Sequence, residues 1–202
     1  TKYWHADFSP SSKSEELVAK EIRASLWDSV EKHMRSDVTV GSFLSGGIDS
    51  SIIVAMAREF NPKLKTLSVG FERDGYNEIN LAEDTAEELK VENFSHTITV
   101  EEFMAEFPRF VWHMDDPLAD PAAMPQFFLS ALARKHVKVA LSGEGADELF
   151  GGYGIYNEPH ALRMFNLTGK YTNQAIHQLA QLMPDGVKGK SFLLRGTVPL
   201  EH

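Results

Sequence analysis

The six residues from Ser45 to Ser50 have the types and the spacing to hold a phosphate chain. They read Ser-Gly-Gly-Ile-Asp-Ser and stand between an apolar run at residues 38–44 and a helical apolar pattern at residues 52–60. Glycines let the backbone turn sharply and approach a ligand, and the first turn of the following helix presents unpaired N–H groups and the positive end of its dipole. No Gly-Lys-Ser/Thr follows the glycines, which excludes a Walker A loop. The segment therefore predicts an anion cradle at a junction of strand, turn and helix.

A second loop that could do chemistry follows another short apolar run, at residues 137–141. Residues 142–153 read Ser-Gly-Glu-Gly-Ala-Asp-Glu-Leu-Phe-Gly-Gly-Tyr, so the carboxylates of Glu144, Asp147 and Glu148 come just after an expected strand. Ligands of open parallel sheets bind outside the carboxyl ends of the strands, so we expect both loops to open onto one cleft. The alternatives are a tight corner without a ligand for the first loop and a solvated acidic turn for the second.

Apolar periodicity predicts an alternating α/β domain that would position these loops. The first helix is expected after a capping box at residues 12–15 and buries one stripe, Val18, Ile22, Leu26, Val30 and Met34. Strands are expected at residues 38–44, 65–71, 94–100 and 137–141, and helices at residues 52–60, 79–89, 101–114 and 126–135, the last after an irregular Pro-rich loop. This alternation predicts the α/β class, with a parallel twisted sheet flanked by helices in a three-layer α/β/α arrangement. Short helices are expected before a basic turn at residues 185–190.

The composition is typical of an enzyme domain. The chain has 202 residues, 43% of them hydrophobic, a formal net charge of −9 and no cysteine. An acidic chain is not expected to bind nucleic acid or an acidic membrane surface, although local dipoles and bound Mg²⁺ can still hold ATP on it. The lack of cysteine excludes disulfides and zinc–cysteine sites. No apolar run approaches the ~20 residues that cross a bilayer and no signal peptide is visible, so we expect a cytoplasmic location and no membrane partner.

The two loops resemble known motifs. Residues 45–50 resemble the pyrophosphate loop, Ser-Gly-Gly-x-Asp-Ser, of ATP pyrophosphatases, which split ATP between the α- and β-phosphates. Together with residues 142–153, they make the chain look like the synthetase domain of glutamine-dependent asparagine synthetases. Supporting stretches are Lys2-Tyr3-Trp4, Val69-Gly70-Phe71, residues 116–121 and Met124-Pro125. We expect one ATP-binding domain over residues 1–199, and Leu200, Glu201 and His202 look like the remnant of a tag.

The resemblance implies an adenine nucleotide alpha hydrolase-like fold that binds ATP and Mg²⁺. The β- and γ-phosphates of ATP would lie on the N–H groups of residues 45–50, with hydrogen bonds from the nearby serine hydroxyls. Mg²⁺ prefers carboxylate oxygen, so Asp49 is its expected ligand and Asp147 the second candidate. The expected nucleotide-binding residues are Leu44, Ser45, Gly46, Gly47, Ile48, Asp49, Ser50, Ser51, Val69, Ser142 and Gly143.

In the family that the chain resembles, an aspartate side-chain carboxylate attacks the α-phosphate of ATP. This step gives β-aspartyl-AMP and pyrophosphate, and ammonia then displaces AMP to give asparagine. The expected catalytic residues are Glu144, beside the incoming ammonia, and Asp49, through the metal. The resemblance also implies that Asn77 and Glu78 lie near the nucleotide.

Two departures limit what this chain is expected to do alone. The full enzymes of the family carry a glutaminase domain whose N-terminal cysteine releases ammonia from glutamine, and this chain has no cysteine. They also carry a later lysine that stabilises the adenylation transition state, and no segment here matches it. We therefore expect a piece of a larger synthetase, for which a homodimer is the expected form. Two alternatives stay open: a relative that makes another amide, such as a β-lactam synthetase, and a fragment that binds nucleotide without turnover.

Overall fold

The computed structural model describes residues 1–2, 5, 9, 11–72, 79–116 and 118–198. The chain divides into two compact units, Thr1–Gly143 and Glu144–His202, of which the first contains the sheet. That residues 1–199 make one domain stays a prediction. None of the described helices is long and apolar enough to span a membrane.

The described residues of the first unit form a four-stranded parallel sheet with the strand order β3-β2-β1-β4. Its strands are β1 (Val40–Phe43), β2 (Lys65–Phe71), β3 (Glu92–Ile98) and β4 (Val139–Leu141). The register aligns Ser42 of β1 with Thr66 of β2 and with Leu141 of β4. Both loops singled out in the sequence therefore leave neighbouring strands, β1 and β4, at the same carboxyl edge.

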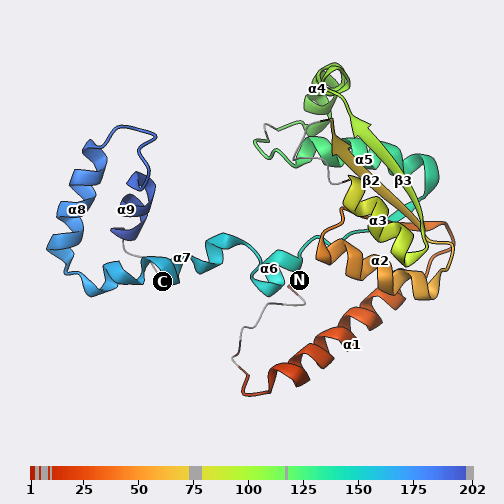
Figure 1. Ribbon diagram of the computed structural model, residues 1–202, viewed down its shortest axis with the longest axis horizontal. Coiled ribbons are helices and arrows are strands. Elements are labelled where there is room, and N and C mark those ends of the chain that lie inside the picture. Colours follow the sequence, from red (N-terminus) through yellow and green to blue (C-terminus); the bar gives the residue numbers. More distant parts are fainter. Residues whose placement is uncertain (3–4, 6–8, 10, 73–78, 117, 199–202) are drawn as a thin grey trace. The chain divides into compact units, whose positions relative to one another are not determined.

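Helices cover both faces of this sheet (Figure 1). One layer contains α2 (Ile48–Phe60) and α3 (Ile79–Leu89), with α1 (Glu15–His33) packed on α2, and the other contains α4 (Val100–Met114) and α5 (Ala123–His136). Successive strand residues point to opposite faces, so Val40 and Leu44 join a buried cluster with Val54 of α2, whereas Leu67 packs with Ala133 of α5. The predicted fold class, a parallel sheet in a three-layer α/β/α arrangement, is confirmed.

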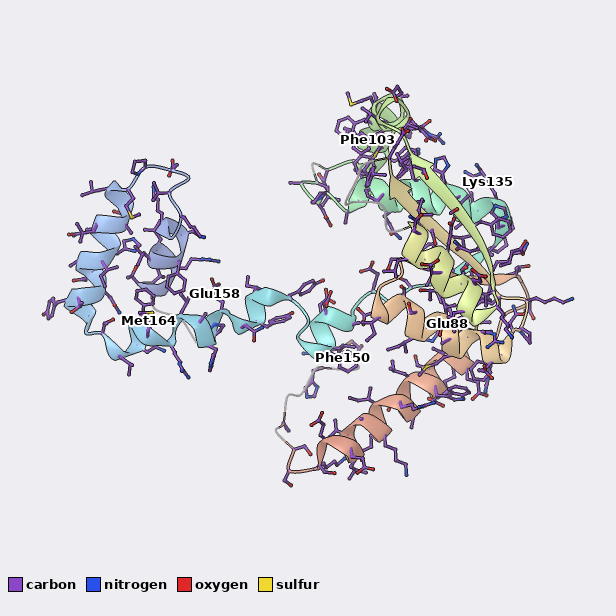
Figure 2. The ribbon with its side chains drawn as sticks, viewed as in Figure 1. Glu88, Phe103, Lys135, Phe150, Glu158 and Met164 are labelled. Carbon is purple, nitrogen blue, oxygen red and sulfur yellow. The ribbon has the colours of Figure 1, made fainter. Side chains whose placement is uncertain are left out.

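The α4 side of the sheet has a separate aromatic cluster. Phe103 of α4, labelled in Figure 2, packs against the buried cluster that contains Ile98, Phe110 and Phe128. Thr99 caps this helix, because its hydroxyl accepts a hydrogen bond from the Glu102 amide at 3.1 Å. The cap ends β3 at Ile98, two residues before the predicted end of the strand.

Other predicted boundaries also shift. Helix α1 is capped by the Ser14 hydroxyl, which accepts from the Leu17 amide, and not by the predicted box that begins at Ser12. Along its predicted stripe only Val30 is buried, because only the end of the helix near α2 packs on the core. Helix α5 begins at Ala123 rather than at residue 126, since Pro125 lies in the first turn, where proline removes no helical hydrogen bond.

The regular secondary structure of the second unit consists of helices alone, among its described residues. It contains α6 (Ala146–Phe150), a 3-10 turn at Gly154–Asn157, α7 (Glu158–Ala161), a 3-10 helix at Leu162–Leu167, α8 (Lys170–Leu182) and α9 (Lys190–Gly196). Its small core holds Leu162, Phe165 and Ala180, and the ring centroids of Phe165 and Phe192 lie 5.5 Å apart. The sequence predicts short helices before the basic turn, whereas α8 is 13 residues long and α9 follows that turn.

Candidate functional site

Gly46 gives the first loop its shape. Its φ of +78° lies in the left-handed region, which favours glycine. A Cβ at this position would also lie 2.7 Å from Cγ and 3.0 Å from the carbonyl carbon of Leu81 on α3. The loop between β1 and α2 therefore passes directly against α3, and only glycine fits there.

Three serine hydroxyls bond within the same loop. The Ser50 hydroxyl is buried, accepts from the Ser45 amide at 3.2 Å and donates to the Gly47 carbonyl at 3.1 Å. The Ser51 hydroxyl also donates to the Gly47 carbonyl, at 2.7 Å, and the exposed Ser45 hydroxyl accepts from the Gly47 amide at 3.3 Å. These bonds fix the shape of the loop, and contact between the hydroxyls and phosphate stays a prediction.

The first amides of α2 make no backbone hydrogen bond to described residues. The backbone ladder of the helix begins with the bond from the Ser51 amide to the Gly47 carbonyl, at 3.1 Å, and Gly47 caps the helix without a side-chain bond. Within the described part of the chain, the amides of Ile48, Asp49 and Ser50 have no backbone acceptor. Such N–H groups and the helix dipole favour an anion.

Asp49 supplies a carboxylate in the first turn of α2, where negative charge interacts favourably with the helix dipole. Its side chain is half-buried, and none of the ion pairs between described residues involves it. No three His, Cys, Asp or Glu side chains gather as a metal site in the described ranges. Mg²⁺ in nucleotide sites uses one or two carboxylates together with phosphates and water, so a single carboxylate beside free amides fits this ion.

The second loop meets the first at Gly143. A Cβ on Gly143 would lie 3.0 Å from the Ser50 amide nitrogen, 3.1 Å from the Asp49 carbonyl carbon and 3.2 Å from the Asp49 Cβ. Before it, the buried Ser42 hydroxyl of β1 donates to the Leu141 carbonyl at 3.4 Å, at the point where β4 ends. The two loops therefore converge, as the parallel topology predicts, and Ser142 and Gly143 lie beside the first turn of α2.

The predicted adenosine contacts at Leu44 and Val69 can involve only the backbone or the edges of these residues. Leu44 is 2% exposed and packs in the core on the α2 side, whereas Val69 packs against the aromatic cluster on the α4 side. Leu44 donates through its amide to the Leu67 carbonyl at 3.0 Å, and its carbonyl accepts from the Ser68 hydroxyl at 2.6 Å. The backbone of Leu44 is thus fixed where the chain leaves the sheet.

Glu144 and Asp147 begin the second unit. Glu144 is exposed and follows Gly143 directly in the chain, and Asp147 lies in the first turn of α6. The Asp147 carboxylate occupies the space that a Cβ on Gly152 would fill, which explains a glycine at that position. Their predicted roles, at the ammonia and at the metal, stay predictions.

Glu148, the third carboxylate of the second loop, is hydrogen-bonded to Tyr153. The Tyr153 hydroxyl donates to Glu148 Oε1 at 2.9 Å. This hydrogen bond is the main reason that the pKa of Tyr153 is raised to about 12; desolvation of the phenol comes second and the negative charge of Glu148 third. Glu148 therefore accepts a hydrogen bond from a tyrosine that stays neutral at ordinary pH.

The sequence prediction missed two residues that support the first loop. Leu81 packs against Gly46, and Ser68 bonds to Leu44 from the neighbouring strand. Ser68 carried a usable signal, because it is a hydroxyl between the apolar residues Leu67 and Val69 of a strand, whereas nothing marks Leu81. The predictions at Tyr3, Trp4, Asn77, Glu78 and residues 199–202 lie outside the described residues.

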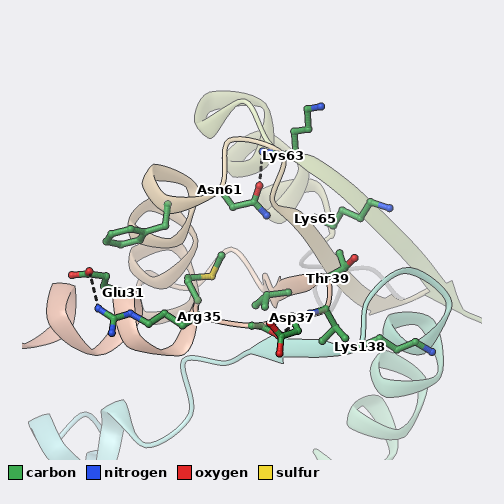
Figure 3. A pocket seen from close by; sticks show the side chains of 13 residues that line it. Glu31, Arg35, Asp37, Thr39, Asn61, Lys63, Lys65 and Lys138 are labelled. Atoms are coloured by element: carbon green, nitrogen blue, oxygen red, sulfur yellow. Dashed lines mark hydrogen bonds and ion pairs between the residues drawn. The ribbon is translucent and has the colours of Figure 1, made fainter.

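A cavity of about 1000 Å³ lies at the opposite edge of the sheet, where β1, β2 and β4 begin (Figure 3). Lys63, Lys65 and Lys138 are among the residues that line it, together with Glu31 and Asp37. Ligands of parallel sheets bind at the carboxyl edge, and the free amides of α2 are there too. This cavity is therefore separate from the candidate site.

Comparisons with known proteins agree with the two loops. The family model described as asparagine synthase matches residues 21–196. The chain is 55% identical to the glutamine-hydrolyzing asparagine synthetase 1 of Bacillus subtilis (strain 168), over 98% of this chain and 32% of that protein. It is 48% identical to a putative glutamine-hydrolyzing asparagine synthetase of Mycobacterium tuberculosis (strain ATCC 25618 / H37Rv), over 100% of this chain and 31% of that protein.

A solved structure of NMN synthetase from Francisella tularensis resembles the chain with a TM-score of 0.45 and 20% identity, covering 70% of this chain and 59% of that one. The chain spans about a third of the length of the two curated relatives, at 32% and 31%.

Proposed function

The chain belongs to the asparagine synthase family, and from that premise we propose that it is the ATP-binding, carboxylate-activating part of a glutamine-dependent asparagine synthetase. One observation supports this function most directly: Gly143 of the second loop lies against the first turn of α2, where amides without a backbone acceptor and the Asp49 carboxylate come together. The matched family and the converging loops both support this proposal.

The amides of residues 48–50 would bind the β- and γ-phosphates of ATP, because these N–H groups and the helix dipole favour negative charge. Asp49 would hold Mg²⁺, which supplies positive charge to the leaving pyrophosphate when it is bound, and Asp147 is the second candidate ligand. The adenosine would lie at the strand ends, near the backbone of Leu44, Val69 and Gly143. This arrangement leaves the α-phosphorus accessible to a nucleophile.

An oxygen of the aspartate side-chain carboxylate then attacks the α-phosphorus. The bond from that phosphorus to the oxygen bridging the α- and β-phosphates breaks, and pyrophosphate leaves with the electron pair. The products of this step are β-aspartyl-AMP and pyrophosphate. Negative charge develops on the phosphates, so N–H groups already aimed at them lower the barrier.

Ammonia next attacks the activated carbonyl carbon, and AMP leaves to give asparagine. Glu144 would orient the ammonia or take the proton that the nitrogen releases. The ammonia would come from glutamine in a longer parent protein, as the names of the relatives indicate for those proteins. A homodimer and a cytoplasmic location of that parent are part of the same proposal.

Release of pyrophosphate that depends on aspartate tests this function. The longer parent protein is incubated with ATP, Mg²⁺ and a panel of carboxylic acids, with ammonium present, and pyrophosphate and amide products are measured. We expect release with aspartate and formation of asparagine. Release with another carboxylate alone would assign the chain to a relative that makes a different amide, and nucleotide binding without release would indicate a binding module.

The Glu144→Gln variant of the parent tests the amidation step. We expect a loss of asparagine formation of about 10²- to 10⁴-fold, because the amide keeps the shape but cannot take a proton. Glu88→Gln, an exposed carboxylate on α3, is the control. Product formation at the parental rate in Glu144→Gln would show that Glu144 belongs to a solvated acidic turn.

A further inference from the structure

A row of polar side chains crosses the apolar layer between the sheet and helices α2 and α3. Among the described residues, four polar side chains are buried, Ser42, Ser50, Thr66 and Ser68. The register places Ser42 of β1 beside Thr66 of β2, and Thr66 beside Asn93 of β3. Polar groups in such a layer are costly unless each of them is hydrogen-bonded.

The hydroxyl protons of Thr66 and Ser68 are too few for the contacts that these two side chains make. Thr66 Oγ1 lies 3.0 Å from the Glu92 carbonyl oxygen and 2.9 Å from Asn93 Oδ1. Ser68 Oγ lies 2.6 Å from the Leu44 carbonyl oxygen and 3.1 Å from the same Asn93 Oδ1. Two hydroxyls have two protons for these four contacts. With Asn93 Oδ1 facing both hydroxyls, as in this structure, two of the contacts lack a proton and the buried Nδ2 has no partner among the described residues.

The opposite orientation of the Asn93 amide satisfies all four contacts. Nδ2 then donates one proton to Thr66 and one to Ser68, and the hydroxyl protons are directed to the carbonyls of Glu92 and Leu44. The orientation of a side-chain amide is assigned from its hydrogen bonds, and this count favours nitrogen between the two hydroxyls. Asn93 thus directs the Ser68 proton to Leu44.

The Leu44 carbonyl belongs to the peptide group that leads into the Ser45–Ser51 loop. The N–H of the same peptide group is the Ser45 amide, which donates to the Ser50 hydroxyl at 3.2 Å. Both ends of the Leu44–Ser45 peptide are therefore held, one from β2 and one from α2. Rotation of this peptide would break both bonds and change the direction of the loop that follows.

We propose that Ser68 and Asn93 are positioning residues for the Ser45–Ser51 loop: Asn93 orients the Ser68 hydroxyl, and Ser68 fixes the Leu44–Ser45 peptide from which the loop departs. Neither residue touches the nucleotide in this account. Only the nucleotide-binding arm of the test below rests on the proposed function.

The test compares Ser68→Ala with Thr66→Val in this chain. Both variants remove one hydroxyl from β2, and the two residues are 2% and 0% exposed, but only Ser68 bonds to the loop. Amide hydrogen exchange of Ser45 is measured by NMR without ligand, together with thermal unfolding and the affinity for Mg-ATP. In Ser68→Ala we expect Ser45 to exchange roughly fivefold faster and Mg-ATP to bind roughly fivefold more weakly, while Thr66→Val lowers only the unfolding temperature.

Asn93→Leu and the double variant with Ser68→Ala complete the cycle. Asn93→Leu should speed Ser45 exchange in the same direction, and the double variant should exchange no faster than Ser68→Ala, because both changes act through one hydrogen bond. Equal effects of Ser68→Ala and Thr66→Val on Ser45 exchange, or additive effects in the double variant, would overturn the proposal. If the unmodified chain fails to bind Mg-ATP, the proposed function fails, and Ser45 exchange alone decides the positioning role.

Discussion

At the scale of single residues, the two neighbouring glycines of the Ser45–Ser51 loop have different requirements. Gly46 has a φ of +78° and no room for a Cβ beside Leu81, whereas a Cβ on Gly47 would meet only the Ser45 hydroxyl, at 3.3 Å. The sequence indicates a glycine turn here but not which glycine is indispensable, because that depends on α3, a distant segment of the chain.

Gly46→Ala should therefore destabilise the chain by about 1–3 kcal/mol, the cost of forcing a side chain into a strained backbone conformation. The clash with Leu81 adds to this cost. Gly47→Ala is the matched control and should change stability far less. Urea unfolding measures the free energy of unfolding of the two variants. Equal losses of stability in both would contradict the conclusion that position 46 requires glycine.

Tyr153 should ionise at a higher pH than an ordinary tyrosine. Its bond to Glu148 favours the neutral phenol and raises its pKa to about 12 from 10.0. Because the folded pKa is the higher one, the stabilising contribution of the phenol is complete below pH 10 and is lost as the pH rises through about 12.

Titration by NMR of the Tyr153 ring signals measures this shift. In Glu148→Gln, the pKa of Tyr153 should fall toward its ordinary value, because the charge that disfavours the phenolate is gone. The other tyrosines serve as internal references. An unchanged pKa in Glu148→Gln would show that another group causes the shift.

At the scale of elements, periodicity predicts the sheet well because each strand is bounded by clear signals. The bounds of β2 and α3 agree with the predicted residues 65–71 and 79–89. Strand β1 begins at Val40, two residues later than predicted, and Val38 is 48% exposed. Apolar content marks residues that favour a strand, but pairing with β2 and β4 determines where the strand starts.

The convergence of the two loops was also predictable, because parallel strands bring their carboxyl ends to one edge. The polar row through Ser68 and Asn93 was not, since it depends on register between strands that are far apart in the sequence. Helix α9 was missed for a similar reason. Its contacts with α8 and Phe165 come from tertiary packing rather than from its own seven residues.

Gly143→Ala tests the contact between the loops. A methyl group would lie 3.0 Å from the Ser50 amide nitrogen, close enough to cover it or to push the second loop away. We expect weaker Mg-ATP binding than in the unmodified chain. Gly154→Ala is the control, since a Cβ there has no neighbour within 4 Å.

Calorimetric titration with Mg-ATP gives the comparison. Equal affinities of Gly143→Ala and the unmodified chain would mean that the close approach of Gly143 to α2 has no part in nucleotide binding. A loss of affinity in Gly154→Ala as large as in Gly143→Ala would mean that the effect is general.

At the scale of the whole molecule, the chain has a net charge of −9, yet the proposed function requires it to attract a highly charged anion. Local features would attract the anion despite this charge, because the first amides and the dipole of α2 act within a few ångströms. Asp49 would repel free ATP but attract Mg-ATP, in which the cation lies between the carboxylate and the phosphates. Binding should therefore depend on Mg²⁺.

Calorimetric titration of Mg-ATP into the unmodified chain, Asp49→Asn and the control Asp84→Asn tests this central claim most directly. Asp84 is an exposed carboxylate on α3, so its removal changes the net charge equally. We predict binding that requires Mg²⁺ in the unmodified chain and in Asp84→Asn, and an affinity lower by roughly tenfold or more in Asp49→Asn. The unfolding temperature of Asp49→Asn should fall only slightly, through the lost interaction of the charge with the α2 dipole. Equal affinities in Asp49→Asn and the unmodified chain, or no binding by the unmodified chain, would contradict the assignment of the Ser45–Ser51 loop as the site for Mg-ATP.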